Sequence, residues 1–531
     1  MTDKYKLITE KPILLVGGGP VGLMTALGLS RMGIPVKLFE DDGTFSSDTK
    51  AGTTLTRTLE ISRRYGGVER ILSNALRVGE IGEIDRVSGT TSFVDNAILA
   101  DDTRFPYVIN IPQHLLEPLL ADELYTRDCC EIFMNHKCIS FEQNEDGVSA
   151  TFDTPDGQVV HEGCYLVACD GSRSMIRTNL GIQVDGHTLD VRYMLIDFNV
   201  DLDVKNFRDY PYLSYHRDED EWMISIRHPH CWRFLYPNKT TEDEPTQEEL
   251  ESKVRKFIGD VDEVEMLNYI SYHVHHRVAE KFRHKRVFLV GDSAHLVTPM
   301  WALGMNTGML DASNLPWRLA WVLRGWAPES LLDGYDTEQR PVAVRGSGEM
   351  AEAARKYMEG QGEEIVSISD GEWGRAYTRT LLGVRLDVDN SGNWSMVKTG
   401  ETPDALTPGD RLPDYSVAGP AGSPMRLHDV IDGKFTALYL TDVRRQPNIP
   451  ANDKESLQHI VVSRYDAPLD SGLREQSLLD VGDAFLNRAG CELGTLILVR
   501  PDEHIAAIVP FDENTSAEAL YKQITGASEI S

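Results

Sequence analysis

The first part of the chain alternates short apolar runs with a longer amphipathic stretch. Residues 13–16 (ILLV) and 36–39 (VKLF) predict two strands. Between them, the apolar residues of 23–29 recur at helical spacing, and Gly33 supplies a helix stop. Short apolar runs of this kind are typical of strands buried on both faces of a parallel sheet. The pattern therefore predicts a strand–helix–strand unit of an α/β fold.

Later segments extend this picture. Apolar runs at 165–168 and 287–290 predict two further buried strands. Residues 186–275 alternate apolar and polar positions, which predicts an antiparallel sheet with one covered face. Toward the end, strands are expected at 435–440, 459–465, 494–500 and 505–510, with a helix at 514–526.

The loop after the first strand carries a phosphate-binding pattern, because residues 17–22 (GGGPVG) satisfy G-x-G-x-x-G. Gly17 allows a sharp turn, Gly19 allows close approach of a pyrophosphate, and Gly22 lets helix and strand pack closely. Pro20 stands at the first helical position. Glu40 ends the second strand, 18 residues after Gly22, where a ribose-binding acid is expected. Strand, glycines, helix and acid in order predict a dinucleotide site.

Two further motifs follow the later apolar strands. One delivers Asp170-Gly171 into a turn, and the other delivers Asp292. Downstream of Asp292, the residues Gly304, Met305 and Asn306 open a long predicted helix. Taken alone, either acid would equally well cap a turn or a helix.

In this order and spacing, the three motifs resemble the flavoprotein aromatic hydroxylases of the p-hydroxybenzoate hydroxylase and phenol hydroxylase type. The resemblance implies FAD as the cofactor. It places Lys50 and Arg57 in the segment that covers the adenosine half of FAD, and Gln113 at the flavin. Residues 335–341 (YDTEQRP) are similar to the family's closing motif.

The same resemblance implies a reaction. NADPH or NADH reduces FAD, O2 adds at flavin C4a, and the resulting hydroperoxide hydroxylates a phenolic or other electron-rich ring. Asp292 would bind the ribityl chain, and Asp170-Gly171 would lie near FAD and the NAD(P)H path. The carbonyl of Pro299 would lie near the substrate hydroxyl. Backbone N–H groups at Gly304–Asn306 would suit the negative charge of the reduced flavin.

Candidate substrate contacts come from the predicted sheet and from the loop after Asp292. A base or hydrogen-bond acceptor favours the phenolate, and His228 and Tyr215 are candidates for that role. The candidate pocket residues are Met300, Trp301, Arg227 and Tyr236. For each of the sheet residues, a surface or structural role is favoured over a role in catalysis or substrate binding. Trp301 and Ala302 replace two small positions of the family pattern, and Lys50 replaces a common arginine.

These motifs divide the chain into domains. The FAD-binding domain, with a Rossmann-like fold, is expected at 1–185 and 276–345, and the substrate-binding sheet domain is inserted at 186–275. A helical segment and linker follow at 346–404. Residues 405–531 resemble the thioredoxin-like C-terminal domain of the phenol hydroxylase subgroup. This region has no C-x-x-C pair, so a structural or dimer-forming role is favoured over redox activity.

The composition of the chain limits the classes of partner that are expected to bind it. Lys and Arg total 53 against 83 Asp and Glu, a net charge of −30, which disfavours nucleic acid and anionic membranes. The sequence holds no apolar run long enough to span a bilayer. Seven scattered cysteines and the absence of metal-ligand spacing favour a reduced cytoplasm and no metal. A small aromatic substrate is the expected partner, and a homodimer stays open.

Two alternatives remain at this point. Flavin-dependent halogenases and reductases share the first motif, although none of the eight tryptophans forms the W-x-W of halogenases. A non-catalytic flavoprotein module is the other alternative, and the loop after Asp292 argues against it. The sequence leaves open the aromatic substrate, the hydroxylated carbon and the choice between NADH and NADPH.

Overall fold

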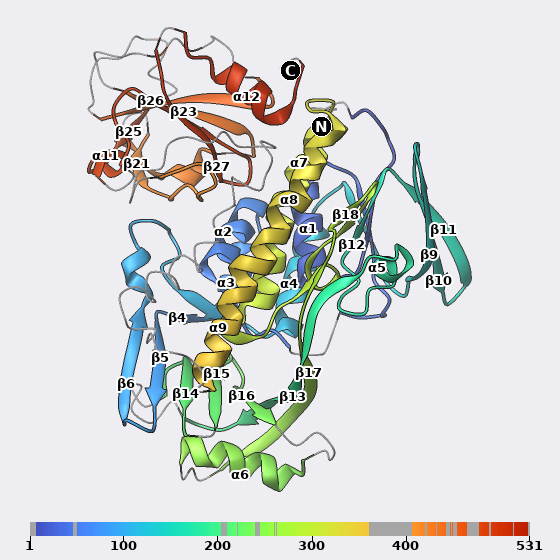
Figure 1. The fold of residues 1–531 in the computed structure, drawn as a ribbon, viewed down its shortest axis with the longest axis vertical. Helices are drawn as coiled ribbons and strands as arrows, with labels where there is room; N and C mark the ends of the chain where they lie inside the picture. Colours follow the sequence, from blue (N-terminus) through green and yellow to red (C-terminus); the bar gives the residue numbers. More distant parts are fainter. Residues whose placement is uncertain are drawn as a thin grey trace.

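The computed structural model describes residues 7–45, 50–202, 210–219, 221–238, 245–259, 261, 263–359, 406–419, 422–431, 433–441, 447, 449, 454–464, 477–487, 490–512 and 514–528. Figure 1 shows three regions along its long axis, with the helix α7 (Leu303–Leu323) running through the centre. The N-terminal strands surround α7, an antiparallel sheet lies below it, and a C-terminal domain lies above.

The central sheet is the expected dinucleotide-binding sheet. Its order is β18-β19-β12-β1-β2-β8, and all neighbours are parallel except β18 and β19. The strands are β1 (Ile13–Val16), β2 (Val36–Phe39), β8 (Cys130–Phe133), β12 (Tyr165–Ala168), β18 (Arg283–His284) and β19 (Val287–Leu289). The predicted strands at 13–16, 36–39 and 165–168 are confirmed, and the fourth is one residue shorter than expected.

Helices cover this sheet. The helix α1 (Pro20–Arg31) packs against α7 and α4 (Gln113–Leu124), and α8 (Asp333–Pro341) packs beside α7. The shorter helices here are α2 (Thr56–Tyr65), α3 (Val68–Leu72) and α5 (Met175–Asn179). Two small antiparallel sheets complete the domain, formed by β3 (Thr53–Thr54), β4 (Leu76–Val78) and β7 (Val108–Asn110), and by β9 (Lys137–Asn144), β10 (Gly147–Thr154) and β11 (Gly157–Gly163).

The substrate sheet is larger than the sequence predicted. It has eight strands in the order β20-β17-β13-β16-β15-β14-β5-β6. The strands are β5 (Glu80–Asp85), β6 (Thr90–Asp95), β13 (Val184–Asn199), β14 (Leu213–Arg217), β15 (Trp222–Arg227), β16 (Trp232–Asn238), β17 (Glu265–Ala279) and β20 (His295–Leu296). Residues 80–95, which were expected in the FAD-binding domain, also belong to this sheet, because β5 pairs in parallel with β14 and brings in β6.

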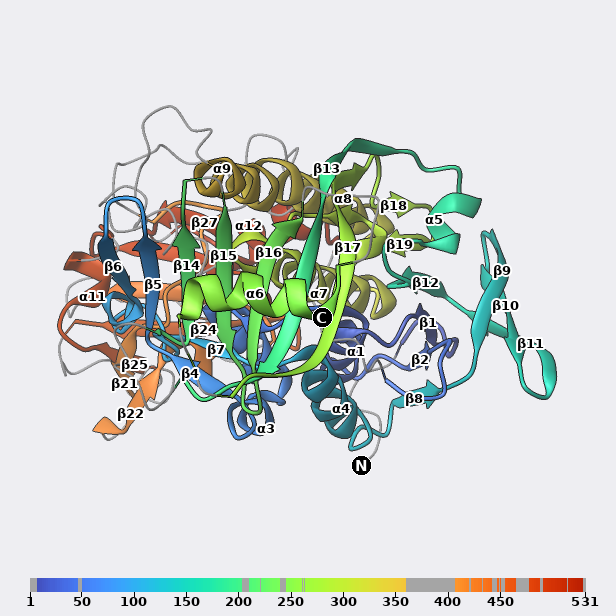
Figure 2. The same ribbon diagram turned by 90° about the horizontal axis from the view of Figure 1, so that it is seen from below.

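The two faces of the substrate sheet have different neighbours. We call the outer face the one covered by α6 (Gln247–Ile258), which crosses the sheet in Figure 2. The inner face packs against the loop before α7 and against α9 (Glu349–Met358), which continues from a π-helix at Val342–Gly348. The inner face is thus the one turned toward the start of α7.

The C-terminal domain is built on a seven-stranded sheet, in the order β22-β21-β25-β24-β23-β26-β27. Its elements are β21 (Ser416–Ala418), β22 (Pro424–Arg426), β23 (Phe435–Thr441), β24 (Leu457–Ser463), β25 (Ser477–Asp480), α11 (Ala484–Asn487), β26 (Thr495–Val499), β27 (Ile505–Pro510) and α12 (Ala517–Thr525). The four expected strands and the terminal helix are confirmed within a few residues. The thioredoxin-like identity stays a prediction, and most of the segment 346–404 lies outside the described residues.

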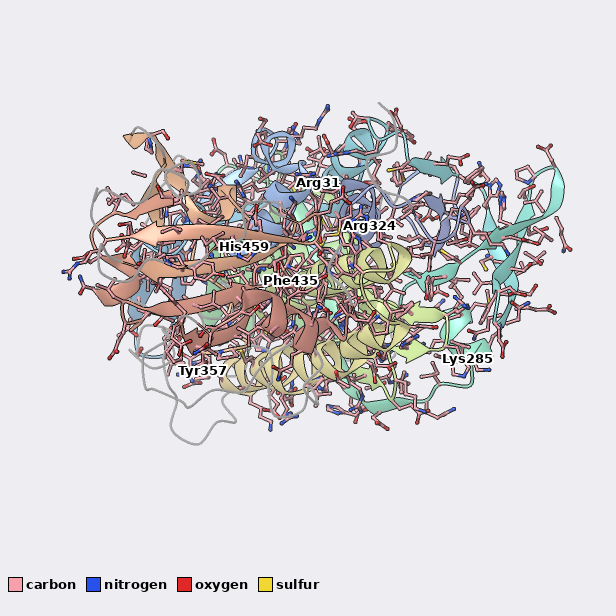
Figure 3. All side chains as sticks on the ribbon, turned by 90° about the horizontal axis from the view of Figure 1, so that it is seen from above. Arg31, Lys285, Arg324, Tyr357, Phe435 and His459 are labelled. Atoms are coloured by element: carbon pink, nitrogen blue, oxygen red, sulfur yellow. The ribbon has the colours of Figure 1, made fainter. Side chains whose placement is uncertain are left out.

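The C-terminal domain sits directly on α7. Figure 3 shows Phe435 of β23 where the sheet overlies this helix. The Phe435 ring lies 5.6 Å from that of Trp317 and 5.7 Å from that of Trp321, both in edge-on contacts. Both tryptophans are buried core residues. In the described part of the chain, no helix is long and apolar enough to cross a membrane.

Candidate functional site

The glycine turn after β1 has the geometry that its sequence predicted. Gly17 has a φ of +108°, and a Cβ there would lie 2.1 Å from the carbonyl oxygen of Cys169. A Cβ on Gly22 would lie 2.0 Å from the carbonyl oxygen of Gly17. Around Gly19, by contrast, a Cβ meets nothing within 4 Å. Because α1 begins at Pro20 with no side-chain cap, its first amides face this open space.

Glu40 closes the turn from the next strand. Its Oε2 accepts a hydrogen bond from the Gly18 amide at 2.5 Å, and its Oε1 accepts one from Asp42 at 3.2 Å. The carboxylate is only half-buried, so its remaining lone pairs are open to a ribose diol. The ribose-binding role stays a prediction.

Asp170 and Gly171 follow β12, the strand beside β1. Asp170 Oδ2 accepts from the Ile176 amide at 3.1 Å, while Oδ1 is buried and has no hydrogen-bond partner among the described residues. Burial raises the pKa of Asp170 above its usual value. Gly171 has a φ of +75° and open space where a Cβ would be. A buried carboxylate oxygen without a donor suggests that a bound group supplies one.

Asp292 follows β19, and its side chain is exposed. Neighbouring protein atoms nevertheless raise its pKa by desolvation, with only partial compensation from His295 and Lys50. Nearby, Asp311 Oδ2 accepts from the Gly291 amide at 2.9 Å and lies 2.8 Å from His295 Nε2. This buried pair fixes the loop that presents Asp292.

The segment at Lys50 is bonded to the start of α4. The Gln113 amide donates to the Ala51 carbonyl at 3.2 Å, and Gln113 Nε2 donates to Glu117 at 2.8 Å. The charge of Lys50 lowers the pKa of Asp292, which opposes the effect of burial. The predicted FAD contacts of Lys50, Gln113 and Asp292 stay predictions.

The loop before α7 holds two left-handed residues in succession. Trp301 has a φ of +57° and Ala302 a φ of +58°. In the family that the sequence resembles, small residues stand at these two positions. Here two residues that carry a Cβ adopt the left-handed conformation, which strains the backbone. Trp301 and Met300 are buried in the apolar core of the inner face. The backbone amide of Trp301 bonds to the hydroxyl of Tyr215 on β14, which joins the loop to the sheet.

Glycine at position 302 is expected to stabilise the protein. A non-glycine residue in the left-handed region costs about 1–2 kcal/mol, while glycine costs about 0.5–1 kcal/mol in chain entropy. We therefore expect Ala302→Gly to raise the free energy of unfolding by about 0.5–1 kcal/mol, measured by urea titration. The matched control Ala353→Gly, on the exposed side of α9, is expected to lower it by about 1 kcal/mol. Equal losses in both variants would contradict the assignment of strain.

Asn306 uses its side chain for the protein itself. Its Oδ1 accepts from the Leu55 amide at 3.0 Å and from Thr58 Oγ1 at 2.7 Å, and its Nδ2 donates to the Thr53 carbonyl at 3.1 Å. The side chain of Asn306 therefore ties the first turn of α7 to residues 53–58. Because Ala302 is the N-cap of α7, the backbone amides of Gly304 and Met305 lie in the first turn and stay candidates for the predicted flavin contact, whereas the Asn306 amide is the first to donate within the helix.

Three residues lie where they cannot have the substrate or cofactor contacts predicted for them. Tyr236 and Arg227 lie on the outer face, where Lys253 Nζ lies 5.6 Å from the Tyr236 ring and Arg227 lies 5.9 Å from the Trp232 ring. They point away from α7, because side chains alternate along a strand and these two have the wrong parity. Arg57 is buried in ion pairs with Glu60 and with Glu503 of the C-terminal domain.

His228 lies in the turn between β15 and β16, packed against the cofactor-covering segment. A Cβ on Gly52 would lie 2.6 Å from His228 Nε2. His228 is buried, and burial together with Arg233 moves its pKa well below its usual value, so the imidazole is neutral. Its role as a base for the substrate stays a prediction.

Sequence reasoning missed a buried ion pair on the inner face. Arg233 of β16 donates from Nε and Nη2 to both oxygens of Asp197 on β13, each at 2.8 Å. Tyr193 and Leu195 share this face with Tyr215 and Leu235. The alternation of β16 contained the signal, since Arg233 and Leu235 have one parity and Trp232 and Tyr236 have the other.

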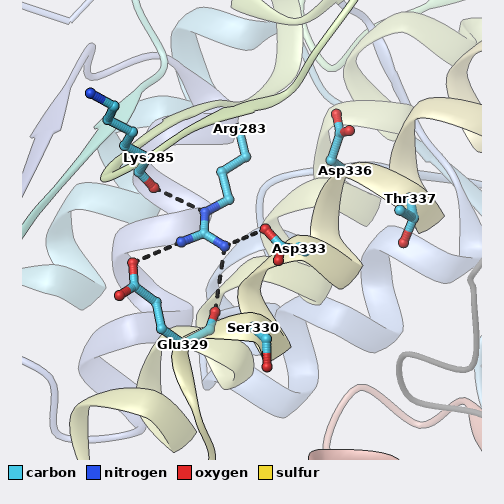
Figure 4. A pocket seen from close by; sticks show the side chains of 7 residues that line it. All are labelled: Arg283, Lys285, Glu329, Ser330, Asp333, Asp336 and Thr337. Atoms are coloured by element: carbon cyan, nitrogen blue, oxygen red, sulfur yellow. Dashed lines mark hydrogen bonds and ion pairs between the residues drawn. The ribbon is translucent and has the colours of Figure 1, made fainter.

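A surface pocket lies apart from these residues. Figure 4 shows it between β18 and α8, with Arg283 at its centre. Arg283 Nη2 lies 2.9 Å from Glu329 Oε1, and Nη1 lies 2.5 Å from Asp333 Oδ1. None of the predicted site residues lines this pocket, and its central guanidinium is already paired.

Comparison with known proteins identifies the family. The family model described as FAD binding domain matches residues 10–346. The chain belongs to this family of FAD-binding proteins. The para-nitrophenol 4-monooxygenase of Pseudomonas sp. (strain WBC-3) is 29% identical over 354 residues, which are 65% of this chain and 87% of that protein. A protein of Bacillus subtilis (strain 168) that is named uncharacterized aromatic compound monooxygenase YhjG is 28% identical over 548 residues, which are 99% of this chain and 98% of that protein.

A solved structure shows the same fold over the whole chain. The flavin-dependent monooxygenase PieE, in complex with FAD and substrate, superposes with a TM-score of 0.78 at 24% identity and covers 98% of this chain and 99% of that one. FAD is the cofactor of this family member, which is an FAD-dependent monooxygenase. The open space at Gly19 and the unpartnered Asp170 oxygen fit that cofactor.

Proposed function

We propose that this flavoenzyme hydroxylates a phenolic or other electron-rich aromatic ring, with NAD(P)H and O2 as co-substrates. The observation that carries the proposal is the contact between Tyr215 and the amide of Trp301. It joins the aromatic inner face of the substrate sheet to the loop that opens α7. Relatives named for para-nitrophenol and for 3-(3-hydroxy-phenyl)propionate support the substrate class.

Three groups of this chain would act where the inner face of the substrate sheet meets the loop before α7. Met300 and Trp301, both buried, would exclude water from the reacting ring. The Pro299 carbonyl would accept a hydrogen bond from the substrate hydroxyl and orient the ring. The first amides of α7 would stabilise negative charge. Bound FAD would activate oxygen, while the protein would position the substrate ring and exclude water from it.

Tyr215 is the residue best placed to orient the substrate oxygen. Burial raises its pKa, so the phenol stays protonated at neutral pH. With the proton retained, the Tyr215 hydroxyl would donate a hydrogen bond to a substrate oxygen.

The function is tested by a screen of phenols, hydroxybenzoates and nitrophenols on the FAD-loaded enzyme. NAD(P)H consumption, product mass and released peroxide would be measured together. The expected result is NAD(P)H oxidation that a phenol stimulates, with one oxygen added to the product. A chloride-dependent product would instead indicate a halogenase, and no turnover with any phenol would reject the proposal.

Two tyrosines on opposite faces of the substrate sheet make a matched pair for this assay. We expect Tyr215→Phe to lower kcat/KM by about 10-fold, because a hydrogen bond to the substrate and the tie to Trp301 are lost. Tyr236→Phe, on the outer face, is expected to behave as the wild type. The FAD content of both variants, measured by visible absorbance, should stay unchanged. Equal effects of the two changes would argue against a role for Tyr215 at the ring.

A further inference from the structure

The turn between β26 and β27 of the C-terminal domain enters the FAD-binding domain. Its charged residues Arg500, Asp502 and Glu503 are each at most 1% exposed. Glu503 has a φ of +66°, an uncommon conformation that aims its side chain into the junction. Three buried charges in one turn are costly unless each is paired.

Glu503 forms ion pairs across the junction through one of its two carboxylate oxygens, while its Oε1 has no hydrogen-bond partner among the described residues. Its Oε2 lies 2.6 Å from Arg57 Nη1 and 2.9 Å from Arg64 Nη1, both on α2. Its Oε1 lies 3.6 Å from His428 Nδ1. Glu60, His428 and Glu503 also bring ligand atoms within 4.8 Å of one another. Arginines already neutralise both carboxylates, so a metal ion has no charge to balance there.

The helix that Glu503 holds is connected to the cofactor site. Thr58 of α2 donates to Asn306 Oδ1 at 2.7 Å, and Asn306 stands in the first turn of α7. Arg64 also donates from Nη2 to Ser313 Oγ of α7 at 2.6 Å. Two contacts therefore link α2 to the helix whose N-terminus faces the flavin position. The segment before α2 runs from Lys50, whose charge acts on Asp292, to Leu55, whose amide donates to Asn306 Oδ1 at 3.0 Å.

We propose that Glu503 is a positioning residue for FAD: through Arg57 and Arg64 it fixes α2, and through Asn306 it fixes the first turn of α7. The C-terminal domain then helps to set the geometry of the cofactor site through Glu503, which acts through other residues. When Glu503 loses its charge, two buried guanidinium groups lose their shared partner and α2 is free to shift. The inference depends on FAD binding alone and not on the substrate class.

The test measures FAD affinity on the full-length apoprotein. We expect Glu503→Gln to raise the dissociation constant of FAD by about 10-fold, the scale of coupling seen for residues without ligand contact. Flavin fluorescence quenching reports binding, and circular dichroism confirms that the apoprotein is folded. The control is Asp483→Asn, which breaks a half-exposed pair with Arg464 in the same domain and is expected to leave FAD affinity unchanged.

A second variant covers the case in which Glu503→Gln does not fold. Arg64→Lys keeps the charge but cannot reach Glu503 and Ser313 together, and we expect a loss of FAD affinity of about 3-fold. A folded Glu503→Gln or Arg64→Lys protein with wild-type FAD affinity would overturn the proposal.

Reciprocal coupling gives an independent readout, because linkage requires that FAD also stabilise the junction. Hydrogen exchange of the wild-type protein is expected to slow at residues 56–65 and 500–504 when FAD is added. In Glu503→Gln this added protection should disappear at 500–504 while it persists at the glycine turn of residues 17–22. Protection at 500–504 that does not respond to FAD would also overturn the proposal.

Discussion

Alanine in place of Gly19 is expected to leave the apoprotein folded while weakening FAD binding by about 100-fold, or about 2.7 kcal/mol. The backbone at Gly19 has a φ of −66°, which alanine adopts readily, and its Cβ would meet nothing within 4 Å. The methyl group would instead occupy the space through which a pyrophosphate approaches the first amides of α1. Titration of the apoprotein with FAD and a thermal melt without FAD measure the two effects separately.

The matched variant Gly22→Ala should show the opposite pattern. Its Cβ would lie 2.0 Å from the Gly17 carbonyl oxygen, so α1 must move away from β1 before the chain can pack. Overpacking of this kind costs about 1–3 kcal/mol, and we expect the loss in the melting of the apoprotein. If Gly19→Ala bound FAD with wild-type affinity, the assignment of this turn to the pyrophosphate would be wrong.

Local patterns were sufficient for the elements that carry the cofactor. The strands at 13–16, 36–39 and 165–168 are short apolar runs followed by glycine or acidic residues, and each stands where it was predicted. Such signals lie within a few neighbouring residues. The place of β5 and β6 in the substrate sheet was missed because their partner β14 lies more than a hundred residues later in the chain. No local pattern specifies that pairing.

The predictions for the substrate-pocket residues Tyr236 and Arg227 were wrong for a different physical reason. Alternation shows which residues of a strand share a face, but it does not show which face meets the cofactor. Tyr215 lies on the inner face, whereas Tyr236 and Arg227 lie on the outer face under α6. Arg57 was assigned to the cofactor by resemblance, and the structure pairs it with Glu503, which is 446 positions away in the chain. Both outcomes depend on tertiary packing.

Arg500→Met is expected to be the most destabilising single change at the junction of the two domains. Arg500 donates to Glu338 Oε1 at 2.9 Å and Oε2 at 3.0 Å, and its Nε donates to Asp502 at 3.0 Å. All three side chains are buried, so removal of the cation leaves two carboxylates short of a partner. Breaking a buried pair in this way costs about 3–5 kcal/mol, to be measured by urea unfolding at pH 7. The exposed-pair control Arg464→Met should cost less than about 1 kcal/mol.

The pH dependence of the stability lost in Arg500→Met tests whether that loss is electrostatic. Burial raises the pKa of Glu338, but Arg318 and Arg500 outweigh it and lower the pKa from 4.5 to about 2. A carboxyl group with a depressed pKa contributes stability that is fully present above pH 4.5 and is lost as the pH falls toward 2. The gap in unfolding free energy between wild type and Arg500→Met should therefore narrow between pH 4.5 and the acid limit of folding. A gap that stays constant over this range would assign the loss to packing of the arginine stem against Trp317, whose ring lies 5.1 Å from the guanidinium.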